Sequence, residues 1–409
     1  PEPYTEPIAP SMREFAPGRV SYRFALKGKR ERMWVEPPNS AEQYLDLGTF
    51  CSDFLHLTRP PGIEEPVIQP RSIQLSRPSA QVSDSSYGRW NWEVFFRTNG
   101  VPIALDVPLG SPWKKQIRSF AVMTHRGRAP LTVWRIARTV DVERRISSEA
   151  PTTQHRVRLE GGDAAIGFSM DVDGLRLDVS LPGRVPTGHG SEVERALRTA
   201  YFEHLILTDP VLVDGTSSSF LREWLVQLSL CAVVTASANR GSGLTELSDA
   251  ELAAAMIQAA RVVFGAEGPS DDPNVPIHDP GLVADVEDVL DDRDVVAAIQ
   301  ECLATLGGPL PPGALGWFHE RYASTIASGF VGAVQAVCPD LDVDDLRPDL
   351  EFLSSEDDGP FARITISEDQ PGGTGVVETA VDRIIEDPRT FWALVGNVLG
   401  PCDGERIDQ

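Results

Sequence analysis

Basic and aromatic residues are concentrated near the start of the chain, a combination that suits contact with nucleic acid. Cationic side chains bind backbone phosphates, and aromatic rings stack on bases. The residues concerned lie around and after the turn at Pro17-Gly18, and they are Arg13, Arg19, Tyr22, Arg23, Lys27, Lys29, Arg30, Arg32 and Trp34. These residues predict a DNA-binding face. The alternative is a solvated strand edge whose charges prevent aggregation.

A second basic group extends this predicted face if the strands that carry the two groups pair. It consists of Lys114, Lys115 and Arg118, with further arginines at 126, 128, 135 and 138. The aromatic residues between the two basic groups have a different pattern. Trp92 alternates with Val94 and Phe96, which predicts a buried strand face and not a stacking platform.

Charge is distributed unevenly along the 409 residues, whose formal net charge is −23. Residues 1–160 contain 23 lysines and arginines against 17 aspartates and glutamates, a net charge of +6. Residues 161–409 contain 14 against 43, a net charge of −29. We therefore expect any contact with phosphate to come from the first 160 residues. The acidic residues 161–409 suit the binding of a basic protein partner or mimicry of DNA.

A glycine-rich turn near the end of the chain is the strongest local motif. It follows the apolar residues Ile364 and Ile366, and it consists of Asp369, Pro371, Gly372, Gly373 and Gly375. The glycines permit positive φ and close approach of a phosphate or a backbone to the start of the next helix. The acidic pair Glu368-Asp369 would repel a phosphate. The favoured interpretation is therefore a structural turn in which Asp369 accepts bonds from free backbone N–H groups.

Several catalytic and metal-binding motifs are absent from the sequence. It has no GxxxxGK[ST] loop, no GxSxG motif, no acid-x-lysine nuclease motif and no lysine after residue 115, so we expect no ATPase motor and no catalytic residue. The histidines show no HxxxH spacing. The five cysteines contain no CxxC pair, and they are Cys51, Cys231, Cys302, Cys338 and Cys402. This pattern predicts buried thiols in the cytoplasm, with no metal and no cofactor.

The sequence predicts mostly strands in the first half of the chain and mostly helices in the second half. Period-2 patterns predict strands at 19–27, 67–76, 91–98, 131–141 and 155–160, and a hairpin of strands 165–169 and 175–180 around Asp171–Gly174. A helix is predicted at 112–122. After the capping box Ser191/Glu194, the pattern predicts helices at 191–205, 217–239, 249–264, 282–306, 312–337, 374–386 and 388–399, with a turn region at 339–358 and a strand at 361–367.

These elements predict an α+β fold with three domains. The first is a basic β-rich domain at 1–185, the second an acidic helical domain at 186–340, and the third a small strand-turn-helix unit at 341–409. No run of 18 apolar residues is present, so no membrane partner is expected. The chain starts at Pro1 without methionine, and we expect it to be part of a longer protein.

Two motifs about 350 residues apart resemble the region after the motor in a family of bacterial superfamily-two DNA helicases. These helicases carry an MrfA-type zinc-binding (MZB) domain. They occur in DNA repair and in anti-phage defence clusters, including DISARM-like, Druantia-like and 7-deazaguanine DNA modification systems. The matching residues are Arg13–Val20, with its Phe-Ala-Pro-Gly turn before a strand, and Ile366–Gly375, with an acidic residue before Pro-Gly-Gly-x-Gly. The family's zinc is not implied here, because only Cys402 follows the second motif.

The resemblance implies an accessory, non-motor region of an ATP-dependent DNA helicase in anti-phage defence or DNA modification and restriction. Its expected partners are DNA, a helicase motor in the same chain or another, and other subunits of the defence complex. The acidic second half keeps a different class open, namely a standalone interaction or scaffold subunit without direct DNA binding. An enzyme with an unrecognised motif is a third alternative.

Overall fold

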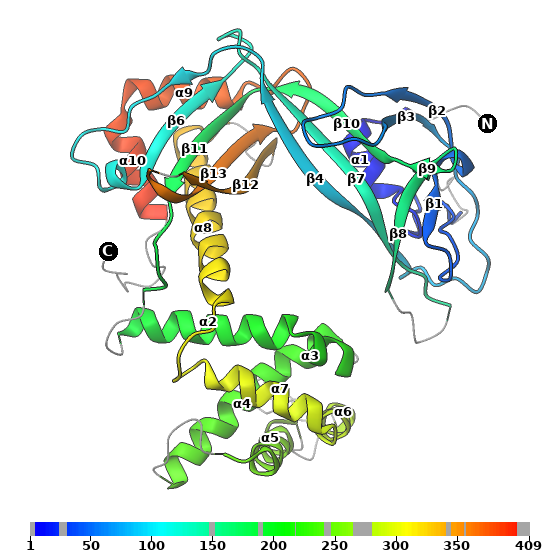
Figure 1. The fold of residues 1–409 in the computed structure, drawn as a ribbon, viewed down its shortest axis with the longest axis vertical. Helices are drawn as coiled ribbons and strands as arrows, with labels where there is room; N and C mark the ends of the chain where they lie inside the picture. Colours follow the sequence, from blue (N-terminus) through cyan, green and yellow to red (C-terminus); the bar gives the residue numbers. More distant parts are fainter. Residues whose placement is uncertain are drawn as a thin grey trace. The chain divides into compact units, whose positions relative to one another are not determined.

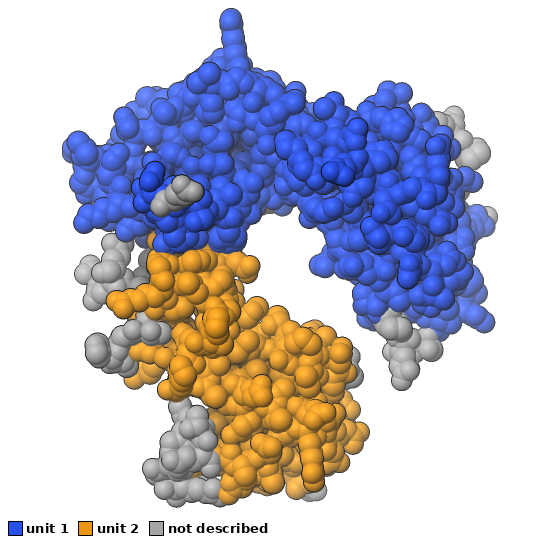
Figure 2. Space-filling model, viewed as in Figure 1, with its two compact units in different colours: residues 1–181, 323–399 blue, residues 182–322, 400–409 orange. Residues whose placement is uncertain are grey.

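The computed structural model describes residues 5–23, 31–146, 152–186, 191–216, 218–240, 247–264, 280–340, 345–355 and 357–398. The chain divides into two compact units (Figure 2). Unit 1 comprises residues 1–181 and 323–399, and unit 2 comprises residues 182–322 and 400–409. The structure is 41% helical and 29% strand, with a β-rich first half, which confirms the predicted α+β class. The three-domain division stays a prediction.

An eight-stranded sheet forms the N-terminal part of unit 1 (Figure 1). Its central strand, β7, pairs with β4 along one edge. Along the other edge, the first part of β7 pairs with β10 and its last part pairs with β8. Met12 of helix α1 and Phe15, the residue just after it, belong to the buried core beside this sheet. The elements are α1 (Ile8–Glu14), β1 (Tyr44–Asp46), η1 (Leu47–Thr49), β2 (Cys51–His56), β3 (Val67–Ile73), β4 (Tyr87–Thr98), β7 (Leu131–Glu143), β8 (Thr152–Leu159), β9 (Gly162–Asp163) and β10 (Ala165–Val172).

A second, five-stranded sheet of unit 1 has the order β12-β13-β11-β6-β5. Its apolar face packs on helices through an aromatic cluster, in which Phe330 of α8 lies 5.5 Å from Phe120 and 5.1 Å from Phe391, centroid to centroid. The elements are β5 (Ile103–Ala104), η2 (Pro112–Lys115), β6 (Ile117–Met123), β11 (Gly174–Ser180), α8 (Gly313–Val337), β12 (Leu346–Ser355), β13 (Gly359–Glu368), α9 (Val376–Glu386) and α10 (Pro388–Val398).

The predicted hairpin at 165–180 is wrong, because its two strands belong to different sheets. β10 pairs with β7 and β3, whereas β11 pairs with β6 and β13. Asp173 alone separates β10 from β11, and its side chain is 3% exposed. The Asp-Gly sequence therefore marks a crossing of the chain from one sheet to the other, and not a reversal.

Two other predictions for the first half also differ from the structure. The described part of the predicted strand at 19–27 contains only an isolated bridge between Ser21 and Met33. The predicted helix at 112–122 is a short 3-10 helix, η2, followed by β6. Ser111 caps η2 and so resembles a helix start, but the next seven residues lie between β11 and β5 in the sheet.

Two predictions for the second half are corrected as well. The turn region at 339–358 contains β12, whose Pro348 is tolerated because β12 is an edge strand. The single helix at 282–306 is divided into α6 (Pro280–Leu290) and α7 (Arg293–Ala304). Asp292 makes this division, since its carboxylate accepts the N–H of Asp294 at 2.9 Å and begins a new helix.

Unit 2 is a helical bundle around a core that includes Phe202, Leu225, Met256 and Ile299. Ser191 caps its first helix as predicted, accepting the N–H of Glu194 at 3.1 Å. That first helix is α2 (Glu192–Thr208). It is followed by α3 (Pro210–Gly215), α4 (Ser219–Arg240) and α5 (Asp249–Phe264), and then by α6 and α7. α4 is long and apolar enough by composition to cross a membrane over Ser219–Ala236, of which 39% is buried. Its leucines belong to this core, which accounts for its composition.

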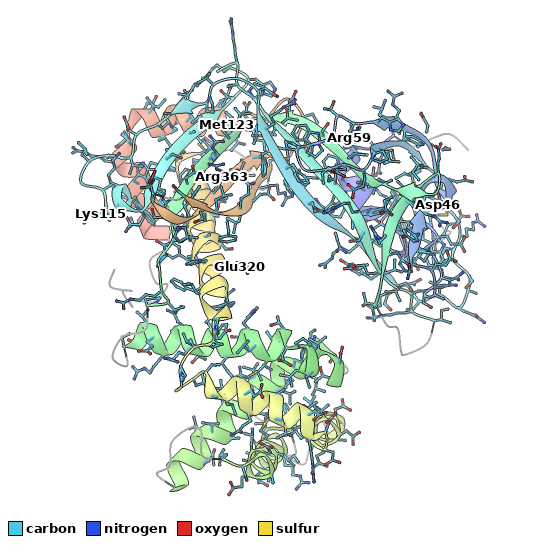
Figure 3. All side chains as sticks on the ribbon, in the orientation of Figure 1. Asp46, Arg59, Lys115, Met123, Glu320 and Arg363 are labelled. Carbon is cyan, nitrogen blue, oxygen red and sulfur yellow. The ribbon has the colours of Figure 1, made fainter. Side chains whose placement is uncertain are left out.

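A charged pair joins two strands of the second sheet and gives a testable acid dependence. Arg363 of β13 (Figure 3) lies opposite Asp178 of β11 and donates to it at 2.8 and 3.0 Å. Burial of Asp178 opposes its ionisation, but hydrogen bonds from Arg363 and Ser119 outweigh burial and hold its pKa below the ordinary 3.8. The folded chain therefore gains stability from this carboxylate above pH 3.8 and loses it as pH falls through the lowered pKa.

We expect Asp178→Asn to lower the free energy of unfolding by about 1–2 kcal/mol at pH 7. The deficit should shrink as pH falls below 3.8, because wild type also loses the charge there. Urea denaturation at a series of pH values measures both effects. Asp163→Asn, which removes the exposed Arg156 pair, should change little, and an equal deficit at every pH for Asp178→Asn would contradict the assignment.

Candidate nucleic-acid interface

Most described members of the first basic group already bind groups of their own unit. Arg23 pairs with Glu6. Arg32 donates to Asp84 at 3.1 Å and to the carbonyl of Ser79 at 2.9 Å. These pairs lower the charge available to phosphates. Lys27, Lys29 and Arg30 lie outside the described residues.

Three further predicted residues have local roles. Arg19 lies 3.6 Å from a carboxylate oxygen of Glu14, and the Tyr22 hydroxyl donates to Asp84. Trp34 is 2% exposed and is bridged through its backbone to Ser76. Its ring is therefore part of the core and is not accessible to a base.

Lys114, Lys115 and Arg118 of the second basic group lie on η2 and β6, at the five-stranded sheet, so strand pairing does not join them to the first group. Arg135 and Arg138 lie instead on β7 of the eight-stranded sheet. Lys114 and Lys115 are exposed on η2 (Figure 3). Arg118 instead fixes the turn between β12 and β13. It donates to the carbonyls of Asp358 and Pro360 at 2.6 and 2.8 Å and lies over the Phe361 ring at 4.8 Å.

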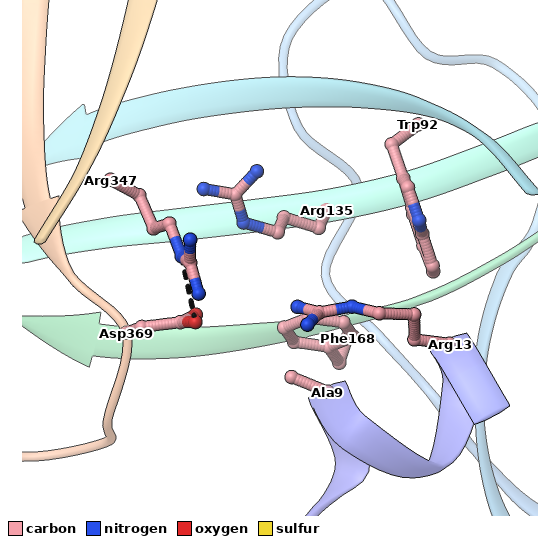
Figure 4. Close-up of a pocket in the computed structure, with 7 residues that line it drawn as sticks. All are labelled: Ala9, Arg13, Trp92, Arg135, Phe168, Arg347 and Asp369. Atoms are coloured by element: carbon pink, nitrogen blue, oxygen red, sulfur yellow. Dashed lines mark hydrogen bonds and ion pairs between the residues drawn. The ribbon is translucent and has the colours of Figure 1, made fainter. Parts of the chain in front are cut away.

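Arg13 is the predicted residue that the structure places in a pocket (Figure 4). The cavity measures about 200 Å³, and its lining comes from α1, β4, β7, β10, β12 and the turn after β13: Ala9, Arg13, Trp92, Arg135, Phe168, Arg347 and Asp369. Sequence patterns did not indicate Phe168 or Arg347, and they assigned Trp92 to the core. No local spacing could have found this set, because both sheets contribute to it.

The pocket is lined by three guanidinium groups and one carboxylate, that of Asp369, and a second carboxylate, Asp349, pairs with Arg135. Arg347 donates to Asp369 at 3.1 Å, and Arg135 donates to Asp349 at 3.1 Å. Burial raises the pKa of Asp349, and Arg135 opposes that shift. Arg13 is exposed, and its guanidinium makes no ion pair with the residues that the structure describes. The pocket therefore has an excess positive charge on Arg13 and a half-buried aromatic wall at Trp92.

The first turn motif has a structural role. Gly18 has φ +88° and donates its N–H to the carbonyl of Val35 at 3.0 Å. A Cβ at Gly18 would lie 2.8 Å from Val142, and one at Gly88 of β4 would lie 1.8 Å from the carbonyl oxygen of Pro17. Glycines at both positions therefore allow the Pro17-Gly18 turn to lie against β4, just after the helix that carries Arg13.

The second turn motif is closed by an internal carboxylate. Glu368 is fully buried, and it accepts the N–H of Val377 at 2.8 Å and the N–H of Thr374. The prediction that Asp369 accepts these bonds is wrong, since Asp369 pairs with Arg347. Gly373 has φ +84°, and a Cβ there would lie 2.7 Å from Glu368. Glu368 thus occupies the place that a phosphate would take at the start of α9.

The described residues do not fit the zinc that the resembled helicase family carries. Within the described ranges, no group of three or more histidine, cysteine, aspartate or glutamate residues could hold a metal ion. Burial raises the pKa of Cys51 and of Cys302 to about 12, which disfavours the thiolate that binds metal. Cys402 lies outside the described residues.

Comparisons with known proteins give one structural similarity. No family model and no curated protein matches the sequence. The crystal structure of the DUF1998 helicase MrfA bound to DNA is similar to this chain with 8% sequence identity and a TM-score of 0.31, a value that does not establish a common fold. The match covers 92% of this chain and 25% of that one, so the chain spans about a quarter of that protein's length.

Loss of the Glu368 carboxylate should destabilise unit 1. Glu368→Ala leaves the buried N–H groups of Thr374 and Val377 without an acceptor, so we expect the free energy of unfolding to fall by about 2–3 kcal/mol. Glu368→Gln retains one acceptor oxygen, so its free energy of unfolding should fall by only about half as much. Chemical denaturation measures both variants. Exposed Glu386→Ala at the end of α9, the helix that Glu368 caps, should lose less than about 0.5 kcal/mol. Equal losses for all three variants would contradict the capping role.

Proposed function

We propose that this chain is an accessory, non-motor region of a bacterial DNA helicase, and that it contacts DNA through the arginine pocket of unit 1. The observation that carries the proposal is the position of Arg13. This residue belongs to the helicase-like motif Arg13–Val20, and its exposed guanidinium lies with Arg135, Arg347 and Trp92 in one pocket. Guanidinium groups bind phosphate oxygens in a planar, two-point geometry.

The cellular role follows from the family that the two motifs resemble. A role in anti-phage defence or DNA modification and restriction, in the cytoplasm, together with a helicase motor and other subunits, belongs to this proposal. The exposed Lys114 and Lys115 supply a second, smaller contact with the DNA backbone. Unit 2 would then dock a neighbouring subunit.

Charge reversal at the pocket tests the proposal. Arg13→Glu should weaken binding of the full chain to all DNA sequences about equally, because phosphate contacts carry no base information. The log–log salt slope should flatten by about one unit for each phosphate that the variant no longer binds. Fluorescence anisotropy of labelled oligonucleotides between low and physiological salt measures affinity and slope.

The matched control is Arg383→Glu on α9, which changes the net charge equally and removes only an exposed pair with Glu386. This control should leave both the affinity for DNA and the salt slope unchanged. If wild type fails to bind single- or double-stranded DNA at low salt, or if both variants weaken binding equally, the pocket is not the DNA contact.

The acidic charge of unit 2 supports a second candidate, a scaffold subunit that binds a basic protein. Residues 182–322 contain 8 arginines against 21 aspartates and glutamates, a net charge of −13. Such a surface repels DNA and attracts basic partners. This candidate is favoured if wild type does not bind DNA at low salt and a basic partner binds the full chain in a salt-sensitive manner.

A further inference from the structure

The pocket of unit 1 has two chemically different sides. Arg13 and Arg347 are exposed at its rim, while Trp92 forms a half-buried wall. Figure 4 shows the Trp92 ring nearly edge-on, with one face turned toward Arg135 and Arg347. Cationic groups therefore face an aromatic surface across one small cavity.

The aromatic wall is held in place by a second ring. Trp92 contacts Phe168 in an edge-to-face arrangement, with centroids 5.9 Å apart and an interplanar angle of 70°. Phe168 is 2% exposed and packs against the indole. A ring fixed in this way loses little conformational entropy when a planar group stacks on it.

The volume of the cavity limits what it can hold. At about 200 Å³, it is smaller than the roughly 300–1,000 Å³ pockets that enclose whole drug-sized ligands. It has room for one planar ring, while an attached sugar and phosphate would remain at the rim beside Arg13 and Arg347. The ion pairs of Arg135 with Asp349 and of Arg347 with Asp369 neutralise the carboxylates that would repel that phosphate.

Resting on the function proposed above, we infer that this pocket binds one unpaired nucleotide of single-stranded DNA, with its base on Trp92 and its phosphate at Arg13. Bases within a duplex are stacked and paired, so they cannot enter a side-chain pocket without being extruded. Base–aromatic stacking tolerates every base, because each has a π face. The pocket thus gives the full chain a preference for single strands without sequence specificity.

The test compares three labelled DNAs of equal length on the full chain: a single strand, a duplex, and a single strand with several abasic sites. Wild type should bind the single strand more tightly than the other two. Trp92→Leu should weaken binding to the single strand about 10-fold, leave duplex binding unchanged, and abolish the difference between the normal and the abasic strand. Trp92→Phe should restore most of the affinity, because it retains a ring.

Controls separate folding from binding. Phe352→Leu removes an aromatic residue that is 44% exposed on β12 and should bind as wild type does. If Trp92→Leu loses its thermal unfolding transition, the comparison of normal and abasic strands on wild type decides the question. Equal binding of all three DNAs would overturn the single-strand inference and leave the proposed DNA contact intact. Absence of binding to any DNA would instead overturn the proposed function.

Discussion

The crossing at Asp173 holds the two sheets of unit 1 together. A buried carboxylate and a buried backbone both need hydrogen-bond partners, and Asp173 has them. Its carboxylate accepts from the backbone N–H of His125 at 2.7 Å, and its carbonyl accepts the N–H of Glu368 at 2.9 Å. Glu368 in turn caps α9. The end of β6, the β10–β11 crossing, β13 and α9 therefore share one buried polar junction, and this junction places Asp369 at the arginine pocket.

The charge of the first half is largely neutralised within unit 1. Pairs such as Arg23 with Glu6 and Arg138 with Glu93 are exposed and contribute little stability. They nevertheless occupy cations that would otherwise be available to a ligand. The net charge of residues 1–160 therefore overestimates the surface that can bind DNA. What distinguishes Arg13 is its position among aromatic residues and its exposure, and not its share of the total charge.

Local signals in the sequence predicted most helices of the second half, because caps and apolar spacing act within a few residues, but they did not predict α1 or α3. Ser191 begins α2 as expected. Several strands were predicted, but not their partners. The Asp-Gly pair at Asp173-Gly174 is a local hairpin signal, whereas β11 pairs with β13, almost 190 residues later. For the same reason Arg13 and Arg135 were named as candidates, while Phe168 and Arg347 of the same pocket were not. The assignment of the capping role to Asp369 failed by one residue, since burial selects Glu368.

Unit 1 is discontinuous in sequence, because residues 182–322 are inserted between its two parts. This arrangement has a consequence during biosynthesis. β11 is made early, but its partner β13 ends only at residue 368, which at typical translation rates is roughly 10–40 s later. Throughout that interval one edge of β11 lacks its final neighbour and is open to wrong pairing. The inserted residues 182–322 are made within the same interval as contiguous helices, which can fold on arrival, before the last part of unit 1 is made.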